Sequence, residues 1–264
     1  MSQFVVAARM LARRTQIVIA LCAATSGAIV AIPGSARADR RSFTRTYEYL
    51  TMPKGGLELE FYNTQSTAVL GEESPSDLKT QVEIEYGITD RWDVSIYQVY
   101  KQSTNPMDAA ASKPFGYAET KLRSRLRLGD RGASFVDTLL YLELIKALGV
   151  SEYKVEPKLI LARDFGQATL AVNLIGEVEL SEGETVFVPG WAAGLTYEIV
   201  PAIKLGAETF GELDLESNEV EAYAGPSISW GPSQSFWVAV NAGFGVTESA
   251  KALSVQAIFA LGIR

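Results

Sequence analysis

From Gly56 onward, the sequence repeats a single unit: a run of roughly ten residues that alternates apolar and polar side chains, followed by a short turn. The pattern is clearest around position 84, where Val82 and Ile84 fall on one face of an extended chain while Glu83 and Glu85 fall on the other. One face suits lipid and the other suits water. This rhythm is typical of the strands of an outer-membrane β-barrel.

The alternation predicts twelve strands, separated by turns rich in Gly, Pro and Asp or by longer polar loops. An even number brings both ends of a barrel to the same side of the membrane. We therefore expect an all-β fold, a closed antiparallel up-and-down transmembrane β-barrel. The predicted strands are 56–64, 78–88, 92–102, 116–128, 137–148, 151–162, 168–180, 186–199, 203–213, 220–230, 236–246 and 253–263.

The face assigned to lipid is apolar in strand after strand. Aromatic residues gather beside the predicted short turns, as expected for rings at the headgroup level: Tyr86, Trp92, Tyr197, Trp230 and Phe236. The alternative is a soluble β-sandwich with aromatic residues in its core. A sandwich, however, requires two apolar faces that meet, whereas nearly every strand here pairs one apolar face with a markedly polar one.

The first 38 residues have the features of a removable export signal. Arg9, Arg13 and Arg14 precede an apolar run over 17–32, and small residues at 36 and 38 flank Arg37 at a cleavage site. We therefore expect a signal peptide over 1–38, a periplasmic N-terminal lead-in over 39–55, and the barrel over 56–264.

Composition narrows the chemistry that the exported chain can perform. The sequence has no histidine, and its single cysteine, Cys22, lies in the predicted signal. Residues 39–264 carry a net charge of −11, because four of the 24 basic residues and none of the 31 acidic ones precede them. We expect no enzyme activity, no cofactor, no metal site and no nucleic-acid partner, because imidazole and thiolate chemistry are missing and the charge disfavours polyanions.

Charged residues on the inward face supply the candidate functional site. Strand 116–128 carries a basic ladder, and neighbouring strands supply acids, so a solute in the lumen would meet both signs of charge. The candidate substrate-binding residues are Glu83, Glu85, Glu119, Lys121, Arg123, Arg125, Arg127, Glu143, Lys154, Glu156, Lys158, Glu177 and Glu179.

The later strands present small inward residues opposite this ladder, among them Gly194, Ala239 and Gly243. Two interpretations stay open. Either the small residues leave a water-filled path past the charges, or the long basic side chains pair with carboxylates and fill the barrel. Twelve strands lie between the filled barrels of about eight strands and the open channels of about sixteen, so barrel size does not decide between them.

The hairpin over 85–94, with the sequence EYGITDRWDV, resembles a hairpin found in porin-like outer-membrane transporters, including the family named for the meta pathway of phenol degradation. The strand over 116–128 is similar to the inward-charged strand that follows in those proteins. The resemblance implies a channel for small solutes or hydrophobic compounds. One departure is the final residue, Arg264, where such barrels usually end on an aromatic residue.

These observations together predict a narrow passive channel or uptake pore in the outer membrane of a Gram-negative bacterium. Its expected partners are outer-membrane lipid, lipopolysaccharide, the barrel assembly machinery and a small-molecule solute. The alternative is a structural or sensory barrel with a filled lumen and no transport.

Overall fold

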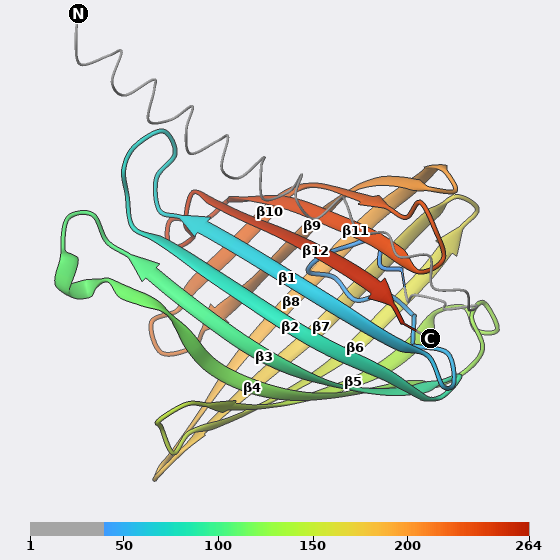
Figure 1. Ribbon diagram of the computed structural model, residues 1–264, viewed down its shortest axis with the longest axis horizontal. Helices are drawn as coiled ribbons and strands as arrows, with labels where there is room; N and C mark the ends of the chain where they lie inside the picture. The colour runs from blue at the N-terminus through green and yellow to red at the C-terminus, as the bar shows by residue number, and fades with distance from the viewer. Residues whose placement is uncertain (1–39, 264) are drawn as a thin grey trace, which may run out of the picture. The chain divides into compact units, whose positions relative to one another are not determined.

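The computed structural model describes residues 40–263, which form a closed barrel of twelve antiparallel strands (Figure 1). Each strand pairs with its neighbours in the chain, and β1 pairs with β12 to close the sheet. The strands are β1 (Leu57–Thr67), β2 (Ser76–Thr89), β3 (Trp92–Thr104), β4 (Lys113–Arg127), β5 (Asp137–Ala147), β6 (Tyr153–Phe165), β7 (Ala168–Ser181), β8 (Glu184–Val200), β9 (Ile203–Asp214), β10 (Glu219–Trp230), β11 (Phe236–Gly245) and β12 (Leu253–Gly262). The predicted fold class and strand order are confirmed.

The connections at the two ends of the barrel differ for most strand pairs; the exceptions are the long β4–β5 connection over 128–136 and the short β7–β8 turn over 182–183. Short turns join β2 to β3, β6 to β7 and β8 to β9 at the end where β1 begins and β12 finishes, which we call the turn end. Longer connections join β1 to β2 and β3 to β4 at the opposite, loop end, where the 3-10 helix η2 (Ala109–Ala111) lies. Gly166 and Gly183 have φ of 64° and 85°, in the left-handed region that favours glycine and that two-residue turns use. No helix within residues 40–263 has the length and apolar character needed to cross a bilayer.

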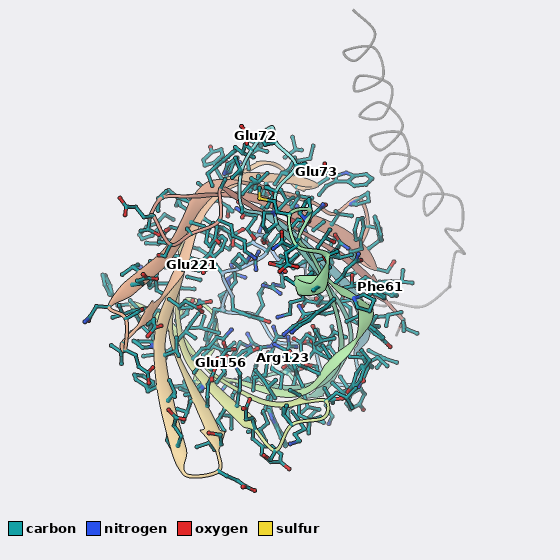
Figure 2. All side chains as sticks on the ribbon, turned by 90° about the vertical axis from the view of Figure 1, so that its left-hand side faces the viewer. Phe61, Glu72, Glu73, Arg123, Glu156 and Glu221 are labelled. Carbon is teal, nitrogen blue, oxygen red and sulfur yellow. The ribbon has the colours of Figure 1, made fainter. Side chains whose placement is uncertain are left out.

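Side chains alternate between the outside and the lumen, as the sequence pattern predicts. Phe61 points outward, while Arg123 and Glu156 point into the barrel (Figure 2). The register places Leu59 beside Ile84 on the outer face and Glu60 beside Glu83 on the inner face. A closed sheet leaves no unpaired strand edge, and an unpaired backbone group in hydrocarbon costs several kcal/mol. An apolar outer face and a polar inner face are what a membrane barrel requires.

The aromatic residues predicted to form a girdle lie on the outer surface beside the turns. Tyr86, Trp92, Tyr197 and Trp230 are all exposed, and Trp230 and Phe236 meet edge to face with their ring centroids 6.2 Å apart. This ring of side chains marks the level of the membrane interface at the turn end.

The segment before β1 does not stay outside the barrel. Residues 40–52, which we call the lumenal segment, fold back into the interior and return to β1 at the turn end (Figure 1). Most of their side chains are buried, including Phe43, Tyr47 and Met52. The expected lead-in is therefore corrected: this segment is packed in the lumen, because its aromatic side chains find apolar partners on the inner wall. The predicted signal over 1–38 lies outside the described residues.

Candidate functional site

Glu208 on β9 holds the tip of the lumenal segment. Its Oε1 accepts the backbone N–H of Thr44 at 3.0 Å, and its Oε2 accepts the backbone N–H groups of Arg45 and Thr46 at 2.8 and 2.9 Å. Glu208 is almost fully buried, so its charge depends on these donors. Three successive N–H groups turned toward one carboxylate form a concave anion-binding arrangement. The tip is thus fixed to the wall by charge-assisted hydrogen bonds.

Tyr47 lies where the lumenal segment meets the basic ladder. Its backbone N–H and C=O bond to the Asn173 side chain on β7, at 2.6 and 2.9 Å. The Arg41 guanidinium lies 4.2 Å from the centre of the Tyr47 ring, and the Lys158 ammonium lies 5.1 Å from it. The ring also packs against Tyr141 with centroids 4.9 Å apart. Cations over an aromatic face attract its electrons, so Tyr47 connects the segment to several inward charges at once.

The small inward residues of β8 accommodate the lumenal segment. A Cβ added to Gly194 would lie 2.4 Å from the Phe43 ring, so only glycine leaves room for the phenyl group there. Phe43 is fully buried in a cluster with Tyr49, Leu139 and Ile160. The part of the small-residue wall around Gly194 is therefore a socket for the segment and not an open path.

The inner part of the basic ladder on β4 is paired with acids from β2 and β3. Arg123 contacts Glu83 at 2.8 Å and Glu85 at 2.6 Å. Arg125 bonds to Asp93 through Nε and Nη2, at 3.0 and 2.7 Å, and also contacts Glu85. All five side chains are at most 2% exposed. Here the structure follows the interpretation in which basic side chains fill the barrel as an ion-pair network.

Arg127, at the turn end of the same strand, does not join this network. Its guanidinium bonds to the Asp90 carbonyl of the β2–β3 turn and lies 5.6 Å from the centre of the Tyr49 ring. Nearby, outside the strands, Arg131 donates two hydrogen bonds to Asp164, and this interaction raises the pKa of the Arg131 guanidinium.

The remaining candidates occupy the inner wall farther toward the loop end. Their pairs are formed mostly between neighbouring strands, and their side chains are half-buried except for that of Glu143, which is buried. The pairs are Lys121 with Glu143 at 2.7 Å, Lys158 with Glu156 at 3.0 Å, Lys154 with Glu177 at 2.9 Å and with Glu179, and Glu119 with Lys101. These are the charges that a solute entering from the loop end would meet.

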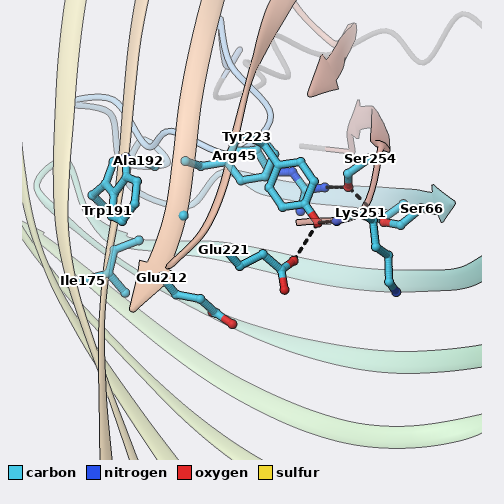
Figure 3. Close-up of a pocket in the computed structure, with 13 residues that line it drawn as sticks. Arg45, Ser66, Ile175, Trp191, Ala192, Glu212, Glu221, Tyr223, Lys251 and Ser254 are labelled. Atoms are coloured by element: carbon cyan, nitrogen blue, oxygen red, sulfur yellow. Dashed lines mark hydrogen bonds between the residues drawn. The ribbon is translucent and has the colours of Figure 1, made fainter. Parts of the chain in front are cut away.

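An open cavity lies between the tip of the lumenal segment and the loop end (Figure 3). We call it the vestibule; it has a volume of about 320 Å³ and is bordered by β1, β7 to β10 and β12. Arg45 reaches it from the lumenal segment, and its wall includes Phe210, Glu212, Glu221 and Tyr223. The Phe210 and Tyr223 rings stack with centroids 5.1 Å apart at 16°, and Tyr223 donates a hydrogen bond to Glu221 at 2.6 Å.

The structure thus divides the predicted site residues into two groups. Glu83, Glu85, Arg123 and Arg125 come together as a buried cluster behind the lumenal segment, whereas the outer pairs lie farther toward the loop end; Arg127, at the turn end, belongs to neither group. Sequence reasoning missed the lumenal segment, and with it the contribution of Glu208. The available signals were three aromatic residues in a polar leader and an acid, Glu208, on the inward face of β9.

Comparison by sequence finds no family model that matches this chain, and no curated protein matches it.

Comparison by structure finds outer-membrane barrels. An outer-membrane channel from Pseudomonas putida F1 is similar with a TM-score of 0.63 and 12% identity, over 83% of this chain and 100% of the other. The KdgM porin, solved in complex with disordered oligogalacturonate, has a TM-score of 0.54 and 10% identity, over 78% and 99% of the two chains. The NanC porin has a TM-score of 0.50 and 9% identity over the same shares. The chain therefore has the fold of porin-like outer-membrane β-barrels.

Proposed function

We propose that this protein is a narrow passive pore for small solutes in the outer membrane of a Gram-negative bacterium, and that the lumenal segment is its constriction. The observation that carries this proposal is the division of the lumen. Toward the loop end the lumen holds an open vestibule with ionisable walls, whereas toward the turn end it is filled by residues 40–52. A solute would enter from the loop end and pass the constriction when the segment shifts.

The outer charged pairs are proposed as the residues that contact the solute. Glu119, Lys121, Glu143, Lys154, Glu156, Lys158, Glu177 and Glu179 lie along the inner wall toward the open part of the lumen. Their side chains range from 4% to 36% exposed, and the most hydrated of them, Lys154 with its two acids, can exchange a partner for a solute at modest cost. The buried group of Glu83, Glu85, Arg123 and Arg125 would instead support the barrel and the lumenal segment.

A second candidate function is a structural or sensory barrel whose lumen stays filled. The buried ion pairs and the aromatic cluster around Phe43 favour this alternative, because they pack the turn-end part of the lumen. The two functions make different predictions about ion flow. A filled barrel conducts no ions with the lumenal segment in place and stays closed in all states, while a pore opens.

Conductance in planar bilayers tests the proposal. We expect the intact chain to show small single-channel steps, and a variant lacking residues 40–52 to show larger and more frequent ones, because the constriction is gone. Arg163→Gln, on the outer face of β6, where the guanidinium bonds to the carbonyls of Ser134 and Phe135, serves as a matched control and should conduct as the intact chain does. An intact chain and a shortened chain that both fail to conduct, although both migrate as folded barrels in unheated gels, would refute the pore.

Three further assignments belong to the same proposal. The partners would be outer-membrane lipid, lipopolysaccharide, the barrel assembly machinery and a small solute. We infer no enzyme activity, because residues 39–264 contain neither histidine nor cysteine. Membership in the family named for the meta pathway of phenol degradation is supported by the hairpin over 85–94, and a search with an alignment of this chain's own homologues would test it.

A further inference from the structure

The vestibule contains a cation, Arg45, that no carboxylate within residues 40–263 pairs with. Arg45 Nη2 donates a hydrogen bond to Ser254 Oγ at 2.8 Å, while its Nε is buried with no hydrogen-bond partner in the described part of the chain. No ion pair joins Arg45 to any residue in 40–263. Glu208 is close enough to attract the guanidinium, but its oxygens already accept the backbone N–H groups of Thr44, Arg45 and Thr46.

An unpaired cation at the wall of a cavity indicates that the cavity binds a negatively charged ligand. Removing a charge from water is costly unless a counter-charge and hydrogen bonds replace the water. A guanidinium presents five donors in a planar fork that matches a carboxylate in two-point contact. Arg45 uses one of these donors on Ser254, and the fork as a whole lies at the vestibule.

The walls beside Arg45 suit an apolar body. The Arg45 guanidinium lies 4.7 Å from the centre of the Phe210 ring, and that ring stacks on Tyr223. Ile175 adds an aliphatic surface. A volume of about 320 Å³ falls at the lower end of small-molecule pockets, so it accommodates a molecule of about one ring with a short side chain.

Two acids limit the charge of the occupant. Glu212 and Glu221 line the same cavity as Arg45. Lys251 lines it too, but its ammonium is paired with Asp77. A second negative charge on the ligand would meet them in a confined space, where like charges repel more strongly than in water. The vestibule therefore favours a single negative charge over two, and disfavours sulfate and dicarboxylates.

We infer that the vestibule is a binding site for small organic monocarboxylates, with the carboxylate on Arg45 and the apolar body against Phe210. The inference deepens the proposed pore, because it names the class of solute that the pore would take. Binding to the purified barrel is measured without ion flow, so the two proposals fail separately.

Calorimetric titration of the purified, detergent-solubilised full chain tests the site. The probes are phenylacetate, its neutral isostere phenylacetamide, and sulfate. We expect phenylacetate to bind and phenylacetamide to bind at least about tenfold more weakly, since a hydrogen bond to a charged partner contributes about 1.5–3 kcal/mol. Arg45→Gln should reduce phenylacetate binding by a similar factor, and Phe210→Ala should weaken it further through the loss of the apolar wall.

Arg131→Gln is the matched control, an arginine removed from a turn away from the vestibule, and should bind phenylacetate as the unmodified chain does. Equal affinity of the unmodified chain for phenylacetate and phenylacetamide would overturn the inference. This comparison needs no variant, so it does not depend on whether Arg45→Gln folds correctly. Unchanged binding by Arg45→Gln, or tighter binding of sulfate than of phenylacetate, would overturn it as well. Binding without conductance would leave the site in place and remove the pore, and conductance without binding would do the reverse.

Discussion

Glu208→Gln is the sharpest perturbation of the lumenal segment, because one carboxylate accepts three of its backbone N–H groups. The amide keeps a single oxygen, so it can satisfy the pair of N–H groups at Oε2 or the one at Oε1, but not both. It also places an NH₂ group against a backbone donor. At least one charge-assisted hydrogen bond is lost, at about 1.5–3 kcal/mol.

This loss should appear as freer opening of the segment and not as general unfolding. A cost of about 1.5–3 kcal/mol corresponds to a roughly 10- to 150-fold change in the ratio of docked to undocked molecules. Amide hydrogen exchange over residues 40–52 reports this ratio when opening is local. We expect the protection of the amides in residues 40–52 to fall by this factor, while the protection of the strand amides stays unchanged. Bilayer recordings should show more frequent open states.

Glu212→Gln provides the matched control for this experiment. Glu212 lies on the same face of β9 and, among the residues described, accepts no hydrogen bond from the lumenal segment. It should leave the protection of residues 40–52 close to that of the unmodified chain. Equal protection in the two variants would refute the role assigned to Glu208, and an equal loss across all strands would show that Glu208 stabilises the barrel as a whole.

Three further substitutions test other parts of the structure. Gly194→Val should expel Phe43 from its socket at a cost of about 1–3 kcal/mol, seen as faster exchange over 40–52, and Phe43→Ala in the same chain should restore docking of the remainder if the clash is the cause. Arg125→Met should destabilise the barrel by about 3–5 kcal/mol, because it removes the close cationic partner of the buried Asp93 carboxylate; urea unfolding in vesicles measures this, and a midpoint equal to that of the exposed-pair variant Arg91→Gln would contradict it. Leu142→Arg on the outer face should cost about 2–4 kcal/mol if this position lies near the bilayer midplane, whereas unaltered unfolding in vesicles would mean that lipid does not contact this face.

The fold was predictable because the alternation of apolar and polar residues within each strand indicates which side chains face lipid and which face the lumen. The alternation around Ile84 and the segment Leu140-Tyr141-Leu142 assign a side to every residue without knowledge of its partners. Short turns such as that at Gly166 then fix each strand to the next. Local information therefore suffices for strand number, order and orientation, since all strands except the pair β1 and β12 join neighbours in the chain.

The lumenal site was less predictable because it is built from distant pairs. The contact between Thr44 and Glu208 joins positions 164 residues apart, and no periodicity reports it. Arg123 and Arg125 were correctly placed inside the barrel, but whether they faced water or carboxylates depended on the register with β2 and β3. The inward glycines left two interpretations open, a water-filled path or a lumen filled by basic side chains, and neither included the contact between Gly194 and Phe43 of the lumenal segment.

The inward-folded lumenal segment also constrains how the molecule is assembled. It is continuous with β1, yet it is anchored on β3, β7 and β9, and the final seam joins β1 to β12, with Ser66 bonded to Ser254 across 188 positions. Two orders of assembly are possible. Either β1 pairs with β12 after the lumenal segment has folded against the incomplete sheet, or the barrel closes first and the lumenal segment inserts afterward from the turn end. In the first order of assembly, the lumenal segment acts as a template around which the sheet curves and closes.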